Sequence, residues 1–326
     1  MMATIRDVAA RAGVAVCTVS RVLNGSAAVS PKTKARITDA MAELDYVPNE
    51  LARGMFRQKS GIVSMLVPSI RHMFFGNLAH FVERELYRHG YKLMLCSTDG
   101  KKEREAEYMR TFRSNLVDGV ILGVASLDLD VYENFKKPLI TTDIRINDSI
   151  PVVVSDNDTG GALAADAFIR RGCKCVIQLI SASERFVLSL QRHLRFAAKL
   201  RDAGIAVQDV EIKWDEFDYH GYQELAQSIL DAHPEIDGVM AADMPACAFL
   251  KAAIRMGRRV PEEFCVVAYD GTYLAHVNTL DMTAVSQPLD EMAAKMVEVL
   301  LELIDGSEVK GTYVQLPVSF RQGETA

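Results

Sequence analysis

The sequence predicts a small all-α domain followed by an α/β body of two doubly wound lobes, and two observations lead to this fold class. Residues 4–45 carry helical patterns only, whereas from Gly61 onward short apolar runs of strand length alternate with helical patterns. Alternation of this kind is typical of parallel sheets covered by helices. Because the body of about 265 residues is longer than a single sheet domain usually is, we expect two lobes.

Two short helices joined at Gly13 are predicted between Thr4 and Gly25. Thr4 can cap the first helix, and Asp7 can complete a capping box with it. Each helix has one apolar stripe at helical spacing, formed by Ile5, Val8, Ala9 and Ala12 in the first and by Val19, Val22 and Leu23 in the second. This is the plan of a helix-turn-helix DNA-binding motif. The alternative is an ordinary helical hairpin with a solvated face.

The second helix turns polar side chains outward, which suits DNA. Arg21 can bind a guanine base through two hydrogen bonds, while Ser, Thr and Asn side chains can bond phosphates. The outward residues are Cys17, Thr18, Ser20, Arg21 and Asn24.

A third helix is predicted from Ser30 and Pro31, which are suited to the cap and the first helical position. Pro48 then breaks the chain and Asn49 can cap a short further helix, so the segment that follows is a hinge candidate. Residues 1–60 hold nine Lys or Arg against five acidic residues, a net charge of +4, which leaves −10 for the remainder of a chain whose total is −6. A basic head on an acidic body favours phosphate contact at one end only.

Buried strands and helices alternate through the body. The helical patterns Phe75–His89, Gly161–Arg171 and Pro245–Met256 each end at a glycine. The apolar runs read as parallel strands, at residues 62–67, 91–96, 119–124, 138–141, 173–180, 238–242 and 264–269. Acidic residues follow several strands, namely Asp143, Asp156, Asp243 and Asp270. Taken singly, each of these is more readily explained as a helix cap or turn former than as a ligand contact.

Four segments of the amino-terminal region together resemble the headpiece and hinge of the LacI/GalR family of bacterial transcription regulators: ATIRDVAARAGV, TVSRVLNG, SPKTKARI and YVPNELARGM. The resemblance implies Rossmann-like lobes of the periplasmic-binding-protein type, with chain crossovers near Asn157, Val285 and Pro317. It divides the chain into a helix-turn-helix headpiece (1–47), a hinge helix and linker (48–60), an amino-terminal lobe (61–157 and 286–316) and a carboxy-terminal lobe (158–285 and 317–326).

The family pattern also assigns DNA contacts. Val16 and Cys17 would read bases by shape and by contact with thymine methyl groups, and Arg21 would read guanine. Met55 stands where relatives place a leucine wedge that enters the minor groove, so we expect the hinge helix to form on DNA; a plain flexible linker is the alternative. The base contacts are thus Val16, Cys17, Arg21 and Met55, and the phosphate contacts are Thr4, Thr18, Ser20, Asn24, Ser30 and Thr33.

The resemblance implies an effector site between the lobes, where parallel sheets place their ligands. Its aromatic faces would stack on a sugar, and its carboxylates, guanidinium and amide would take paired hydroxyl groups. The implied residues are Phe74, Phe75, Asp143, Arg192, Phe217, Asp243, Asp270 and Gln287. Asp156–Gly161 matches a family signature that we expect to be a structural turn. Arg195 replaces a family glycine, which indicates either a displaced helix start or an added charge at the pocket mouth.

These observations predict a ligand-responsive DNA-binding regulator that acts as a homodimer on a near-palindromic operator. The expected role is repression of carbohydrate-utilisation genes, with a small sugar or sugar phosphate as effector; a nucleobase or nucleoside effector is the alternative. A solute-binding protein or a lobe-cleft hydrolase is the rival from another class. We expect no catalytic residues, metal or cofactor, because no ligand or nucleotide-binding spacing stands out. With no signal peptide, transmembrane run or CxxC motif, the expected compartment is the cytoplasm.

Overall fold

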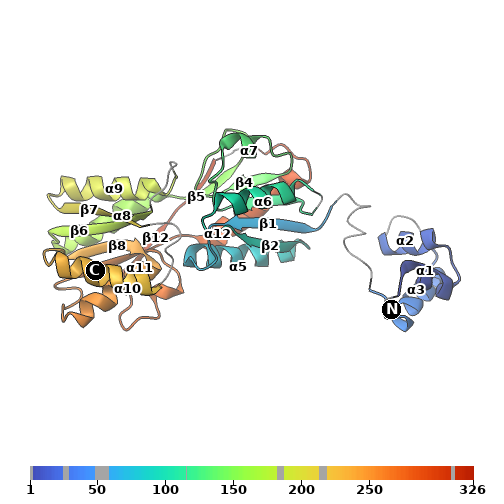
Figure 1. The fold of residues 1–326 in the computed structure, drawn as a ribbon, viewed down its shortest axis with the longest axis horizontal. Helices are drawn as coiled ribbons and strands as arrows, with labels where there is room; N and C mark the ends of the chain where they lie inside the picture. Colours follow the sequence, from blue (N-terminus) through green and yellow to red (C-terminus); the bar gives the residue numbers. More distant parts are fainter. Residues whose placement is uncertain are drawn as a thin grey trace. The chain divides into compact units, whose positions relative to one another are not determined.

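The computed structural model describes residues 3–24, 29–47, 59–114, 116–181, 187–212, 219–309 and 313–326. The chain divides into two compact units, Met1–Gly61 and Ile62–Ala326. The first unit is helical and the second contains both sheets (Figure 1). The fold class expected from the sequence is therefore confirmed.

The described residues of the first unit form three helices: α1 (Ile5–Ala12), α2 (Val16–Asn24) and α3 (Pro31–Glu43). The predicted capping box is present, because the Thr4 hydroxyl accepts from the Asp7 amide while the Asp7 carboxylate accepts from the Thr4 amide at 2.8 Å. Ser30 caps α3 by accepting from the Thr33 amide at 3.2 Å. The three helices share a small apolar core, whose fully buried members are Val8, Val19 and Ile37.

The turn between α1 and α2 is held by Arg36 of α3. Its guanidinium donates to the backbone carbonyl oxygens of Ala12 and Gly13, which form the negative end of the α1 dipole. Gly13 has φ 61°, and a Cβ there would lie 2.8 Å from Arg36 Nη2. The glycine therefore serves both the left-handed turn and the close approach of α3.

The described residues of the second unit contain two six-stranded sheets. The first sheet has the order β11-β5-β4-β3-β1-β2, with β1 (Ile62–Val67), β2 (Lys92–Ser97), β3 (Gly119–Leu122), β4 (Leu139–Thr141), β5 (Val152–Ser155) and β11 (Tyr313–Leu316). The second has the order β12-β10-β9-β8-β6-β7, with β6 (Cys175–Ser181), β7 (Ala206–Ile212), β8 (Gly238–Ala242), β9 (Cys265–Asp270), β10 (Thr283–Ser286) and β12 (Ser319–Arg321). Neighbouring strands are parallel except for the pair β10 and β12.

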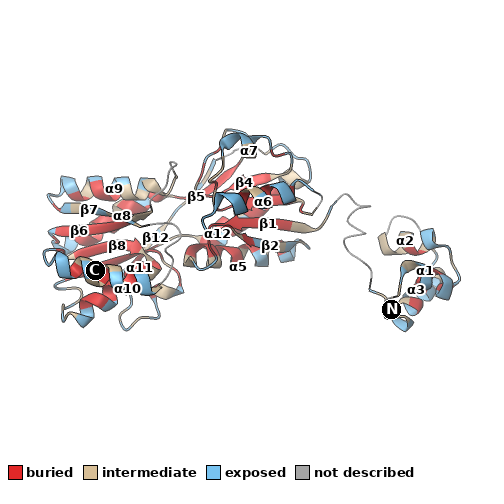
Figure 2. Cartoon of the chain, viewed as in Figure 1, coloured by how far each residue is buried: buried red, intermediate tan, exposed pale blue. Residues whose placement is uncertain are grey.

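Helices cover both faces of each sheet, so that each sheet lies buried between two apolar layers (Figure 2). In the first lobe, α5 (Met73–Arg88) and α12 (Leu289–Ile304) pack on one face, and α6 (Lys102–Phe112) and α7 (Leu129–Glu133) on the other. In the second lobe, α8 (Asn157–Arg171) and α9 (Leu190–Asp202) pack on one face, and α10 (Tyr219–Ala232) and α11 (Asp243–Arg255) on the other. A short 3-10 helix, η1 (Tyr273–Ala275), follows β9.

The chain passes between the lobes three times, after β5, after β10 and after β11. Strand register places these crossovers side by side. Ser155 at the end of β5 pairs with Leu316 at the end of β11, and Ser286 at the end of β10 pairs with Ser319 at the start of β12.

Glu105 of α6 is a fully buried carboxylate that ties the loop after β3 to the lobe. It accepts hydrogen bonds from the Ser126 amide (3.1 Å), the Ser126 hydroxyl and the Tyr132 hydroxyl. We expect Glu105→Ala to lower the free energy of unfolding by about 3 kcal/mol, because three hydrogen bonds lose their buried acceptor. Urea denaturation measures this change. Glu107→Ala, at an exposed position on the same helix, should stay within about 0.5 kcal/mol, and equal effects of the two variants would contradict the assignment.

Candidate functional site

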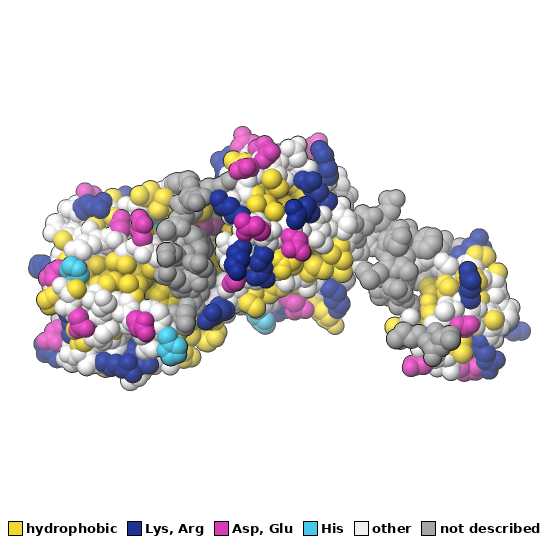
Figure 3. All heavy atoms as spheres, viewed as in Figure 1, with side chains coloured by type: hydrophobic (Ala, Val, Ile, Leu, Met, Phe, Trp, Pro, Cys, Tyr) yellow, Lys and Arg dark blue, Asp and Glu magenta, His cyan; other side chains and the backbone are white. Residues whose placement is uncertain are grey.

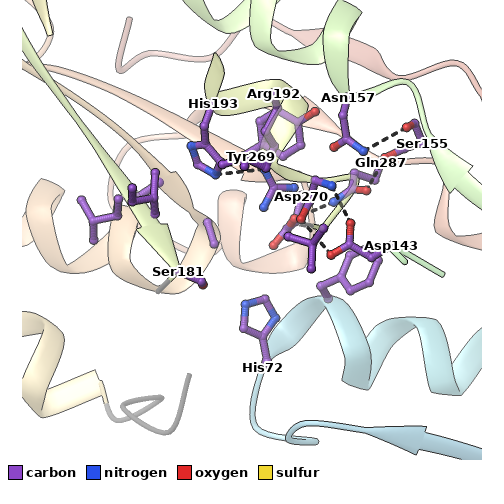
Figure 4. Close-up of a pocket in the computed structure, with 18 of the residues that line it drawn as sticks. His72, Asp143, Ser155, Asn157, Ser181, Arg192, His193, Tyr269, Asp270 and Gln287 are labelled. Carbon is purple, nitrogen blue, oxygen red and sulfur yellow. Dashed lines mark hydrogen bonds between the residues drawn. The ribbon is translucent and has the colours of Figure 1, made fainter. Parts of the chain in front are cut away.

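A cavity lies between the two lobes at the carboxyl ends of their strands. It has about 1040 Å³ of empty space, open solvent included, and both lobes line it (Figure 4). This position is where parallel sheets commonly place a small-molecule site. The polar and aromatic lining residues are His72, Phe74, Phe75, Thr142, Asp143, Ser155, Asn157, Ser181, Ser189, Arg192, His193, Tyr222, Tyr269, Asp270 and Gln287.

Arg192 carries the only guanidinium or ammonium group among the described residues that line the cavity. Its guanidinium carbon lies 4.3 Å from the centre of the Tyr269 ring, a cation–π arrangement. Its Nε donates to Nε2 of His193 at 3.4 Å. The side chain is thus held on two sides before any ligand binds.

Asp270 ends β9 and meets the crossover residue Gln287. The Gln287 side-chain amide donates to Asp270 Oδ1 at 2.7 Å, and the Ser155 hydroxyl donates to Gln287 Oε1 at 2.5 Å. Burial, followed by the nearby Asp243 carboxylate, raises the pKa of Asp270 to about 7, while Arg192 and Gln287 act in the opposite direction. Asp270 therefore changes charge near neutral pH.

Asp143 forms a direct bridge between the lobes. Its carboxylate accepts from the Ser189 amide at 2.6 Å and from the Ser189 hydroxyl at 2.8 Å, and its backbone carbonyl accepts from the Leu188 amide at 2.6 Å. Val187, from the same segment of the second lobe, packs against the core of the first lobe. Burial raises the pKa of Asp143, partly offset by Ser189 and Arg192.

Aromatic and imidazole rings complete the walls. Phe74 and Phe75 meet edge to face with ring centres 5.1 Å apart, and His72 meets Phe75 in the same way at 5.5 Å. Burial, followed by the charge of Arg192, lowers the pKa of His72 to about 4 and that of His193 to about 3. Both imidazoles are therefore neutral at physiological pH, so they can donate or accept hydrogen bonds without adding charge.

Most of the residues implied by the family pattern come together here. Six of them line the cavity, namely Phe74, Phe75, Asp143, Arg192, Asp270 and Gln287. Phe217 lies outside the described residues. Sequence reasoning missed Tyr269, Ser189, His72 and His193. Tyr269 and His193 directly neighbour Asp270 and Arg192 in the chain, which was the one available signal for them.

Asp243 lines a smaller adjoining pocket, which shares His72, Tyr222 and Asp270 with this cavity, so its contact with an effector stays a prediction. Its carboxylate accepts from the Thr272 amide and hydroxyl, each at 2.6 Å, and from the Gly271 amide at 3.1 Å. Burial raises the pKa of Asp243 to about 6. The side chain holds the loop after β9 in place.

The Asp156–Gly161 stretch is structural, as predicted. The Asp156 carboxylate caps α8 by accepting from the Thr159 amide at 3.0 Å. Asn157 nevertheless also reaches the cavity, where its Oδ1 is buried without a hydrogen-bond partner among the residues that the structure describes. Arg195 is exposed on α9, its Nε 3.6 Å from Asp158 Oδ2, and is not among the residues that line the cavity.

The first unit presents the residues predicted to read bases. Val16, Cys17 and Arg21 are exposed on α2, and Thr18, Ser20 and Asn24 are half-buried beside them. The hydroxyls of Thr4 and Ser30 serve as helix caps, and Thr33 Oγ1 lies 2.9 Å from Ser30 Oγ. Met55 and its neighbours lie outside the described residues, so the wedge stays a prediction.

In the described ranges, no helix is long and apolar enough to cross a membrane, and no group of three or more His, Cys, Asp or Glu side chains could hold a metal ion. Acidic and basic side chains are both spread over the visible face of the second unit (Figure 3). This mixed surface contrasts with the net positive charge of residues 1–60.

Comparison with known proteins gives the family. The family "Bacterial regulatory proteins, lacI family" matches residues 4–49, and "Periplasmic binding protein-like domain" matches residues 165–326. The ribose operon repressor of Halalkalibacterium halodurans is 32% identical over 325 residues, covering 99% of this chain and 97% of that protein. The ribose operon repressor of Bacillus subtilis is 34% identical over 320 residues, covering 98% and 97%.

Structural similarity extends over the same length. The solved complex of the transcriptional regulator CelR with cellobiose has a TM-score of 0.71 and 27% identity, and covers 99% of this chain and 100% of that one. The similarity therefore includes the helical headpiece as well as both lobes. The chain belongs to the LacI family of bacterial regulatory proteins.

Proposed function

We propose that this protein is a sugar-responsive transcriptional repressor that binds operator DNA as a homodimer. The observation that carries the proposal is that one chain joins an exposed helix-turn-helix face to a cavity lined by both lobes of a separate unit. Full-length relatives named as ribose operon repressors support the same role. Each headpiece takes one half of a near-palindromic operator, as the symmetry of a dimer requires.

The lining of the cavity favours a neutral polyol as effector. One guanidinium faces two carboxyl groups, those of Asp143 and Asp270, so a phosphate group would meet little net positive charge. Hydroxyl groups of a sugar can both donate to carboxylates and accept from Arg192, while Phe74 and Phe75 cover its apolar faces. A neutral sugar therefore matches the site better than a sugar phosphate.

The effector acts by differential binding. A molecule that contacts both lobes stabilises the arrangement in which the lobes are closed around it. The size of the change in operator affinity is limited by how much more tightly the closed arrangement binds this molecule than the open arrangement does. The protein binds its sugar without turnover in this scheme, and the cavity serves as a sensor.

Operator selection followed by a ligand screen tests the proposal. Random duplexes enriched on the full chain should yield a near-palindromic site, and D-ribose, sucrose, cellobiose and adenosine should then be tested for thermal stabilisation and for altered operator affinity. We expect one sugar to produce both effects over one concentration range. Failure to enrich any sequence, or conversion of the bound sugar to a product, would overturn the proposal; a response to adenosine alone would favour the nucleoside alternative.

Arg21→Ala should relax base preference at one position in each half-site, at a cost of about 1 to 3 kcal/mol. The reason is that Arg21 is the exposed cation on the DNA-facing side of α2. Binding selection with both proteins measures the change. Arg6→Ala, on the exposed surface of α1, is the matched control and should leave the preferred sequence as it is. An unaltered preference in the Arg21 variant would remove it from base recognition.

A further inference from the structure

A line of four polar side chains runs from the outer edge of the second sheet to the cavity. It starts at Asp209 on the exposed edge strand β7, passes through the buried Gln178 on β6, and reaches His193 and Arg192 at the start of α9. Only its last two members line the cavity. Asp209 and Gln178 do not line it, so neither can contact a ligand there directly.

The orientation of the Gln178 amide is fixed by its neighbours. Its nitrogen Nε2 lies 2.7 Å from Asp209 Oδ1 and 3.3 Å from the backbone carbonyl oxygen of His193. A carboxylate and a carbonyl can only accept hydrogen bonds, so both positions require the donor end of the amide. The acceptor oxygen Oε1 must therefore face His193, whose Nδ1 lies 3.1 Å away.

This orientation selects one tautomer of His193. Because Gln178 Oε1 can only accept, Nδ1 of His193 carries the proton, and in a neutral imidazole Nε2 then keeps its lone pair. Nε2 accepts the hydrogen bond from Nε of Arg192 at 3.4 Å, as Figure 4 shows. The opposite tautomer would set two N–H groups against each other at this point.

We propose that Asp209 and Gln178 are positioning residues that determine how the cavity presents Arg192 to its ligand. They hold His193 as the Nδ1–H tautomer, which ties Arg192 by its Nε while the guanidinium rests on the Tyr269 ring. The Arg192 Nε is bound to His193 and one face of the planar guanidinium rests on the Tyr269 ring. The two terminal nitrogens are therefore the donors that can bind two neighbouring oxygen atoms of a ligand. The ligand's role as effector rests on the function proposed above, whereas the tautomer of His193 does not.

The tautomer can be measured without any ligand. Long-range ¹H–¹⁵N correlation spectra of the full chain labelled with ¹⁵N-histidine distinguish the two neutral tautomers, and the His193→Gln variant identifies the His193 signals. We expect the Nδ1–H form in the wild type. In Gln178→Leu, which removes the acceptor, and in Asp209→Asn, which frees the amide to turn, we expect a shift towards the Nε2–H form. Gln208→Leu, at an exposed position on β7, should leave the signals unchanged.

Ligand affinity supplies the second readout, with D-ribose as the probe in titration calorimetry. Gln178→Leu and Asp209→Asn should weaken binding roughly threefold to tenfold, at unfolding temperatures within a few degrees of the wild type, and Gln208→Leu should not. Absence of D-ribose binding to the wild type would count against ribose as the effector, and the spectra would still decide the positioning role. An Nε2–H tautomer in the wild type, or no change of tautomer in either variant, would overturn the inference.

Discussion

Gly161→Ala is expected to destabilise the second unit by about 3 kcal/mol, near the upper end of the range for overpacking. A Cβ at this position of α8 would lie 2.2 Å from the carbonyl oxygen of Arg192 and 2.9 Å from its carbonyl carbon. Both atoms belong to the backbone of α9, so no rotamer change can relieve the contact. The two helices must separate, and the segment that moves carries Arg192.

Urea denaturation measures the stability change, and titration with the sugar identified in the screen measures the accompanying loss of effector affinity. Gly221→Ala provides the matched control, because this glycine also lies in a helix and a Cβ there would meet no atom of the described residues within 4 Å. It should stabilise the protein by roughly 0.5 to 1 kcal/mol. Equal changes in the free energy of unfolding for the two variants would show that the close approach of α8 and α9 does not contribute to stability.

Asp270→Asn is expected to abolish the effector response while operator binding persists. The change keeps the acceptor that receives the Gln287 amide but removes the charge offered to ligand hydroxyl groups. The headpiece is a separate compact unit, so its DNA affinity should be retained. Operator titrations with and without sugar measure both properties, and a normal sugar response would remove Asp270 from the effector site.

The same variant should alter how stability depends on pH. The pKa of Asp270 is raised in the folded protein from 3.8 to about 7, so the folded state binds more protons than the unfolded state between these values. By linkage, the contribution of Asp270 to the free energy of unfolding is largest below about pH 4 and falls as pH rises towards 7. Asp243, with its pKa raised to about 6, contributes in the same direction.

Above pH 7, Asp270→Asn should therefore be more stable than the wild type, on the order of 2 to 4 kcal/mol, and its stability should fall less between pH 4 and 7. Denaturation curves across this range measure the difference. Asp202→Asn, at an exposed position at the end of α9, should follow the wild-type profile. A steeper fall in the Asp270 variant than in the wild type would contradict the direction of its pKa shift.

Sequence patterns identified most of the central strands, although not β10, and among the edge strands they identified β2 but not β7, β11 or β12. Strands such as β1 and β9 are buried on both faces and therefore appear as continuous apolar runs. In contrast, β7 and β11 are edge strands in which exposed residues are interspersed with half-buried ones, so neither gives such a run. A segment of this kind becomes a strand because a neighbour is available to pair with it, and the neighbour is distant in sequence.

The candidate site shows the same limit. Acidic residues after strands mark the correct edge of the sheets, but the pattern does not say which donors each carboxylate meets. Asp143 binds Ser189 across the cleft, and Asp243 binds Gly271 and Thr272 within its own lobe. The partner of Asp143 lies 46 residues away in the chain, and those of Asp243 lie 28 and 29 residues away. Only the structure therefore distinguishes a carboxylate that bridges the lobes from one that holds a loop.

The side-by-side crossovers between the lobes have a mechanical consequence. Three adjacent tethers oppose sliding and twisting of one lobe on the other, and they leave bending about a common pivot as the easiest motion. Ser155, Asn157 and Gln287 lie at two of these tethers and also line the cavity. A sugar bound there would contact residues close to the hinge axis. A small displacement near that axis produces a large displacement at the far ends of the lobes.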